Sequence, residues 1–201
     1  RERERERERE RKRLKFSPKP KPKRFKLRTT RHDLNVPVRG RSDVLTRIEK
    51  SIEIGAPPEK VWEMLTIDRF REWQEEMRRE EIEKSLEYTS KVNTPKDKYK
   101  VGTSGHFYTK EMGLGEIDFE VTESLENQKL THYLKKSGTN QAMGIITCIL
   151  ESINEGTKFT CVFDYTMPWG IFGKFLDKVT YRLTEKGVEK WCTNLKNILE
   201  K

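Results

Sequence analysis

The sequence has few of the residues that mark secreted, membrane-spanning or metal-binding proteins. Its three cysteines, Cys148, Cys161 and Cys192, are odd in number and widely spaced, so they match neither a disulfide framework nor a CxxC metal pair. The three histidines share no metal-binding spacing. No apolar run approaches the roughly 20 residues of a membrane span, and the first residues carry no apolar segment of the signal-peptide type. We therefore expect a cytoplasmic protein with buried free thiols and with no metal or cofactor.

Familiar catalytic motifs are missing as well. The sequence contains no Gly-rich phosphate loop, no GxSxG and no HExxH. A cyclase or dehydratase needs a base within reach of an acidic C–H bond and a donor for the enolate oxygen. No pair of carboxylates stands out for this task from the 33 acidic residues. Catalysis is therefore compatible with the sequence but is not indicated by it.

Charge is abundant, and the positive excess lies at the N-terminus. Residues 1–45 hold 18 basic and 7 acidic side chains out of 42 and 33 in the whole chain, so residues 46–201 keep 24 and 26, a net charge of −2. Residues 1–10 repeat Arg-Glu with nothing apolar to bury, and residues 11–31 add eleven Lys or Arg and no acid. This composition predicts a disordered basic extension over residues 1–45, followed by one domain over residues 46–201.

Two interpretations of the extension remain open. It is either a solvated appendage or an electrostatic tether through residues 11–31 to RNA, the ribosome or an anionic membrane. Only Phe16 and Phe25 could stack on bases, so sequence-specific recognition of nucleic acid is not indicated.

The apolar pattern of the remaining chain predicts an α+β fold. Alternation predicts a strand over residues 47–54, and helical spacing after Pro57-Pro58 predicts two short helices broken near residues 66–68, the second capped by Asp68 and extendable through residues 74–84. Residues 93–100 are expected to be a polar loop. A period of 3.6 from Phe172 through Leu183 to Leu199 predicts one long helix. Strands with short connections, which indicate antiparallel hairpins, are predicted over residues 86–92, 103–111, 116–122, 129–136, 142–151 and 157–167.

Two segments near the start of this domain resemble a known superfamily. Residues 51–65, SIEIGAPPEKVWEML, and residues 70–73, FREW, are similar to the opening of the START/Bet v 1-like (SRPBCC) superfamily, in particular its polyketide cyclase/dehydrase and lipid-transport members. The resemblance covers about residues 46–201. It implies a helix-grip fold, in which a curved antiparallel sheet wraps around the long C-terminal helix, two short helices follow the first strand, and an elongated cavity lies between sheet and helix.

The resemblance also implies where a ligand would bind. It suggests that a hydrophobic small molecule or lipid is bound, or bound and transported, in this cavity, whereas a polyketide cyclase/dehydrase-like enzyme and a ribosome- or RNA-associated protein are the alternatives. Each proposed wall residue could equally be ordinary core, because a filled core and a lined pocket use the same residue types. The candidate ligand-binding residues are Phe107, Phe119, His132, Ile145, Phe163, Tyr165, Trp169, Phe172, Phe175, Leu176 and Val179.

Three polar residues could orient or act on such a ligand. His132 lies in the middle of a predicted strand, and if it points inward it could hydrogen-bond a ligand or move a proton. His106 and Lys50 are weaker candidates of the same kind. For each of the three, an exposed or structurally satisfied side chain is the competing interpretation.

Overall fold

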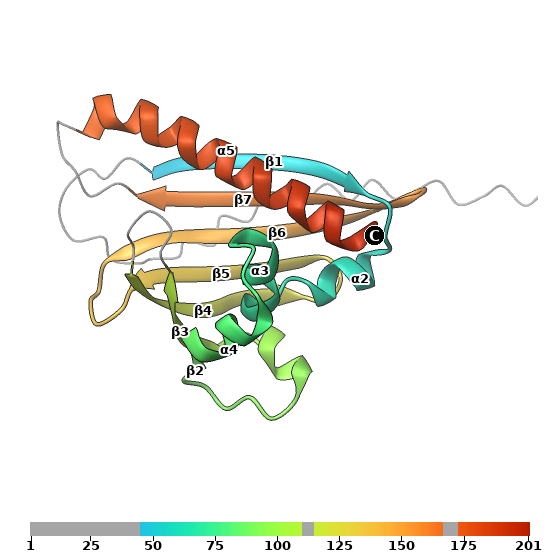
Figure 1. The fold of residues 1–201 in the computed structure, drawn as a ribbon, viewed down its shortest axis with the longest axis horizontal. Helices are drawn as coiled ribbons and strands as arrows, with labels where there is room; N and C mark the ends of the chain where they lie inside the picture. Colours follow the sequence, from blue (N-terminus) through green and yellow to red (C-terminus); the bar gives the residue numbers. More distant parts are fainter. Residues whose placement is uncertain (1–44, 110–114, 167–172) are drawn as a thin grey trace, which may run out of the picture. The chain divides into compact units, whose positions relative to one another are not determined.

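The structure is a computed structural model, and it describes residues 45–109, 115–166 and 173–201 (Figure 1). All of them belong to one unit, Arg41–Lys201. The predicted N-terminal extension therefore lies outside the described residues, apart from residue 45. No helix in the described part of the chain is long and apolar enough to cross a membrane. The elements are β1 Leu45–Ile54, α2 Pro58–Glu63, α3 Ile67–Gln74, α4 Arg79–Ser85, β2 Leu86–Tyr88, the 3-10 helix η1 Pro95–Tyr99, β3 Ser104–Thr109, β4 Gly115–Leu125, β5 Lys129–Lys136, β6 Ala142–Ile153, β7 Gly156–Thr166 and α5 Gly173–Leu199.

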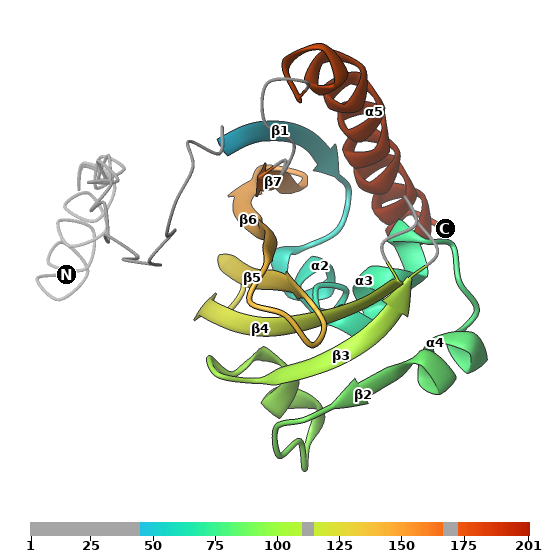
Figure 2. The same ribbon diagram turned by 90° about the vertical axis from the view of Figure 1, so that its left-hand side faces the viewer.

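The seven strands form one antiparallel sheet in the order β1-β7-β6-β5-β4-β3-β2. Every strand from β3 to β7 pairs with its neighbour in sequence, as the short connections predict, and β1 closes the other edge beside β7. Figure 2 shows the sheet bending around α2 and α3, with α5 running along the β1 side. This arrangement is the α+β helix-grip fold expected from the sequence.

The C-terminal helix packs through only part of its apolar stripe. Val188, Trp191, Cys192 and Leu195 are buried, whereas Leu183 is 65% exposed. The expectation that Leu183 continues the buried stripe is therefore wrong. Residues 173–180 belong to the helix, but their side chains lie outside the described part of the structure.

The helices after β1 differ from the prediction in two respects. Thr66, not Asp68, occupies the N-cap position of α3. The charged stretch does not extend α3, because α3 ends at Gln74, Glu76 adopts a positive φ of 52°, and a separate helix begins at Arg79. A non-glycine residue in this left-handed region is uncommon, and it reverses the chain here so that α4 folds back beside α3.

The polar loop predicted after the second strand contains the short helix η1, whose N-terminus is capped by hydrogen bonds to a side chain. The carboxylate of Asp97 accepts hydrogen bonds from the backbone N–H groups of Asn93 and Thr94, at 2.9 and 2.7 Å. Asp97 thereby holds η1 in place beside the start of β3. The preceding strand is shorter than predicted and ends at Tyr88.

Candidate functional site

The candidate site lies on the face of the sheet that packs against α3 and α5, which we call the interior face. One row of paired residues crosses it from β4 to β1, and all of its members are buried. The ring of Phe163 in this row lies 6.4 Å from that of Trp191 on α5, which places the row on the helix side. The row consists of Val121, His132, Ile146, Phe163 and Ile48.

His132 is the polar member of this row. Its side chain is 2% exposed, and its Nε2 atom has no hydrogen-bond partner among the described residues. Its paired neighbours, Val121 and Ile146, are both apolar. Burial lowers the pKa of the imidazole from 6.5 to about 4, because the charged form loses its hydration. His132 is therefore neutral near pH 7 and presents one unsatisfied polar atom to an apolar interior.

One aromatic ring meets His132, and three more lie further along the same face. The ring of Phe119 meets His132 edge-on at 6.4 Å between centroids, and Phe107 lies 6.2 Å beyond Phe119. Further along the sheet, Phe163 and Tyr165 stack at 5.2 Å with an interplanar angle of 27°. These four aromatic residues, all predicted from the sequence, are buried on the interior face. Together with His132 they form a largely apolar surface, whose hydrogen-bonding groups are the imidazole of His132 on β5 and the hydroxyl of Tyr165 on β7.

The prediction for Ile145 is wrong by one residue. Ile145 pairs with Tyr133 and Asp164 and is half-buried on the outer face, whereas Ile146 is buried on the interior face. Trp169 and Phe172 lie outside the described residues, and Phe175, Leu176 and Val179 lie in the part of α5 whose side chains are not described. Their assignment as wall residues stays a prediction.

The other two polar candidates, Lys50 and His106, lie close to carboxylates away from His132. Lys50 reaches across to α5, where its Nζ lies 2.9 Å from Glu185 and 3.9 Å from Glu189. His106 is on the outer side of β3, with its Nε2 3.4 Å from Glu87. Neither lies beside His132.

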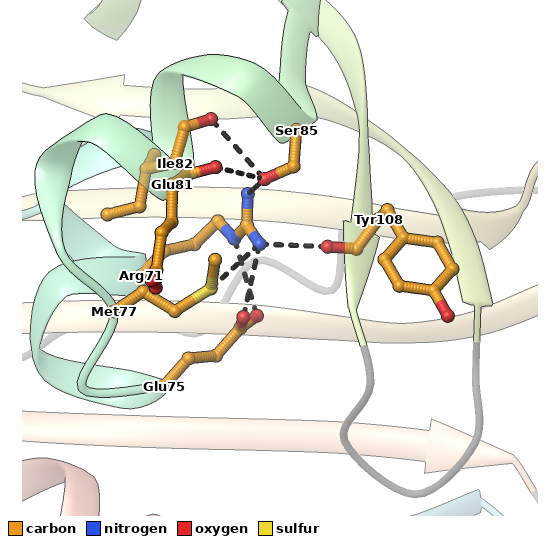
Figure 3. Close-up of polar contacts among 7 residues, drawn as sticks. All are labelled: Arg71, Glu75, Met77, Glu81, Ile82, Ser85 and Tyr108. Carbon is orange, nitrogen blue, oxygen red and sulfur yellow. Dashed lines mark hydrogen bonds and ion pairs between the residues drawn. The ribbon is translucent and has the colours of Figure 1, made fainter.

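A buried ion pair, which the sequence analysis did not identify, supports one end of the aromatic surface. Arg71 is fully buried, and its guanidinium group lies 5.0 Å from the centre of the Phe107 ring. It donates to both carboxylate oxygens of Glu75 at 3.3 and 3.1 Å, to Ser85 at 2.9 Å and to the carbonyl of Tyr108 at 2.8 Å (Figure 3). Arg71 thus ties α3, α4 and β3 together and fixes the position of Phe107.

A hollow of about 830 Å³ lies between α2, η1 and the turn after β4, away from His132. It contains the stacked rings of Trp62 and Tyr99, whose centroids are 5.1 Å apart. Burial opposes ionisation of Asp68, but hydrogen bonds from Lys98 and Thr66 outweigh it and hold the pKa of this carboxyl below its ordinary value. Lys98 donates to Asp68 at 2.6 Å, so the charged pair beside the stack is satisfied within the fold.

Comparison with known proteins agrees with this architecture. The family described as polyketide cyclase / dehydrase and lipid transport matches residues 46–200. The chain belongs to this family. The match confirms the superfamily predicted from the opening strand and helices. No curated protein matches the chain in sequence.

Solved structures show the same family fold at low sequence identity, which supports the fold alone. TTHA0849 from Thermus thermophilus has a TM-score of 0.55 and 19% identity, covering 76% of this chain and 95% of that one. BH1534 from Bacillus halodurans has a TM-score of 0.55 and 19% identity, covering 79% and 99%. MLL2253 from Mesorhizobium loti has a TM-score of 0.54 and 19% identity, covering 77% and 97%.

Proposed function

We propose that the protein binds a hydrophobic small molecule or lipid against the interior face of the sheet, and that His132 orients it. The observation that carries the proposal is the unpaired Nε2 atom of His132, buried on the interior face beside the ring of Phe119. A buried polar atom without a partner costs about 1–3 kcal/mol. A bound molecule that supplies the missing hydrogen bond would remove this cost.

The apolar surroundings favour the same interpretation. Phe107, Phe119, Phe163 and Tyr165 are the described aromatic residues of the proposed wall. A ligand placed against these buried rings gains about 25 cal/mol for each Å² of its own apolar surface that leaves water, and a single polar contact then sets its direction. Membership of a family described by lipid transport as well as by cyclase activity agrees with a binding role.

Catalysis at the same place is the second candidate, and the geometry favours it less. A neutral imidazole can accept a proton, as a cyclase or dehydrase requires. A second donor is needed for the developing oxyanion, and the described neighbours of His132 on the interior face, Val121, Ile146 and the ring of Phe119, offer none. We therefore place binding before catalysis.

The test combines a binding measurement with a location measurement. The full chain is titrated with N-phenyl-1-naphthylamine, an uncharged fluorescent probe, and the imidazole signal of His132 and the indole signals of Trp191 and Trp62 are followed by NMR. We expect saturable binding of one probe that shifts the signal of His132 more than that of Trp191, which lies against Phe70 and Phe163. Trp62 lines the hollow between α2 and η1 and serves as the internal control. Absence of binding, or a shift confined to Trp62, would refute the proposal.

The basic extension supports a separate and weaker proposal. Residues 11–31 could hold RNA, the ribosome or an anionic membrane by charge alone. If they bind RNA, the logarithm of affinity should fall with the logarithm of salt concentration by about 0.7–0.9 per phosphate contact, and deletion of residues 1–45 should abolish binding. Equal RNA binding by the truncated chain would exclude the extension as the cause.

A further inference from the structure

The apolar surroundings of His132 constrain the charge that a ligand can carry there. Its paired neighbours on β4 and β6, Val121 and Ile146, are apolar, and the ring that meets it is Phe119. The Nε2 atom is therefore not held by any charged group of the strands on either side. The question is whether a cation elsewhere on the interior face could neutralise an acidic ligand.

Arg71 is the buried cation on this side of the fold, beyond Phe119 and Phe107. Each of its three guanidinium nitrogens already donates. Nε and Nη2 donate to Glu75, Nη2 also donates to the carbonyl of Tyr108, and Nη1 donates to Ser85. Its positive charge is balanced by the Glu75 carboxylate at 3.1 Å. A ligand anion would therefore have to compete with the buried Glu75 carboxylate for this charge.

In the described strands two lysines occupy interior-face positions, and neither is available beside His132. Lys50 on β1 is paired with Glu185 at 2.9 Å. Lys136 pairs in register with Ile117, but it is exposed at the end of β5. Four residues of strand separate Lys136 from His132, a distance of about 13 Å. Among the described side chains, the part of the interior face around His132 thus holds a hydrogen-bonding group and no free positive charge.

We propose that the ligand is uncharged where it meets His132, and that it presents a hydroxyl or carbonyl group there instead of a carboxylate or phosphate. This inference rests on the proposed function. A carboxylate moved from water to this position would lose its hydration, and no free cation among the described side chains there would compensate for that loss. A neutral imidazole, by contrast, can accept from a hydroxyl or donate to a carbonyl. Burial also lowers the pKa of His132, so the ring does not itself supply a charge near pH 7.

The experiment uses ligands that share one ring system and differ at one group. 2-Naphthol, methyl 2-naphthoate, 2-naphthoate and naphthalene each compete with N-phenyl-1-naphthylamine on the full chain at pH 7.5. We expect the naphthol and the ester to bind at least about tenfold more tightly than the carboxylate. A carboxylate that binds as tightly as the neutral pair would overturn the inference and leave the proposed function standing. Failure of the probe itself to bind would overturn both.

Variants of His132 assign the effect to the imidazole. His132→Leu should weaken 2-naphthol by roughly fivefold to tenfold, the loss of one hydrogen bond, and leave naphthalene unchanged. His132→Gln keeps a donor and an acceptor and should retain most of the naphthol affinity. If the affinities for naphthol and naphthalene fall equally in His132→Leu, the histidine contributes packing only and the inference is wrong. Should the leucine variant fail to fold, His132→Phe, which also lacks a hydrogen-bonding group, gives the same comparison.

Discussion

Replacing His132 by leucine should remove a specific part of the acid sensitivity of the fold. In the folded protein burial lowers the pKa of His132 from 6.5 to about 4. At pH 7.5 the imidazole is neutral in both folded and unfolded chains and contributes nothing to the pH dependence. As the pH falls through 6.5, the unfolded chain takes up a proton first, so stability is lost until the pH approaches 4.

The magnitude follows from the two pKa values. Each unit of pKa difference is worth about 1.36 kcal/mol, so the wild-type protein should lose about 2 kcal/mol through His132 between pH 7.5 and pH 5, and about 3 kcal/mol below pH 4. His132→Leu has no proton to bind and should not show this loss. At pH 7.5 the variant should be at least as stable as the wild type, because it removes an unpaired buried atom.

Urea unfolding of ligand-free protein at pH 7.5, 6.5, 5.5 and 5.0 measures the effect. The quantity of interest is the stability of the variant minus that of the wild type at each pH. Acidic groups such as Asp68 contribute equally to both proteins and cancel in this difference. We expect the difference to grow by about 2 kcal/mol toward pH 5. A difference that stays constant with pH would show that His132 is hydrated in the folded state, and the argument for a ligand contact there would fail.

Two further predictions concern the framework around the site, and urea or thermal unfolding measures both. Arg71→Met should destabilise the fold by about 3–5 kcal/mol, because it leaves the nearly buried carboxylate of Glu75 without its partner, and the double variant with Glu75→Met should recover most of the loss. If the single and the double variant lose the same stability, the unpaired Glu75 carboxylate is not the cause of the loss. Gly105→Ala should cost about 1–3 kcal/mol, since a Cβ there would meet the backbone carbonyl of Glu87 and the ring of Phe119. The matched control Gly187→Ala, in open space on α5, should gain about 0.5–1 kcal/mol, and a loss there would show that the glycine is required.

The sequence predicts the orientation of a strand correctly where one face is apolar and the other is polar. In β4 the alternation of Ile117, Phe119 and Val121 with acidic residues can be satisfied by only one orientation, and all three are buried. In β6 nearly every residue from Ala142 to Leu150 is apolar or small, so alternation cannot choose a face. Pairing with β5 makes the choice and turns Ile146 inward. The error at Ile145 thus arises because the deciding information lies in another strand.

The buried ion pair escaped prediction for a similar reason. Arg71 and Glu75 are four residues apart in a charged stretch, which is typical of a solvent-exposed helix face. They are buried because the chain reverses at Glu76 and brings α4 over them, and because β3 arrives from more than 30 residues away in sequence. Neither event is visible in the local pattern of residues 70–80.

The packing of α3 also bears on where within the interior a ligand would lie. Phe70 and Trp73 of α3 occupy the space beside α5, where Phe70 lies 6.2 Å from Trp191 and Trp73 lies 6.2 Å from Phe159 of β7. The β7 side of the interior is therefore filled by aromatic contacts between helices and sheet. His132, with its unpaired atom, lies two strands away on β5. A molecule bound to the interior face would thus meet β4 and β5 before it met the buried half of α5, because the contacts under that half of the helix are already made by the protein itself.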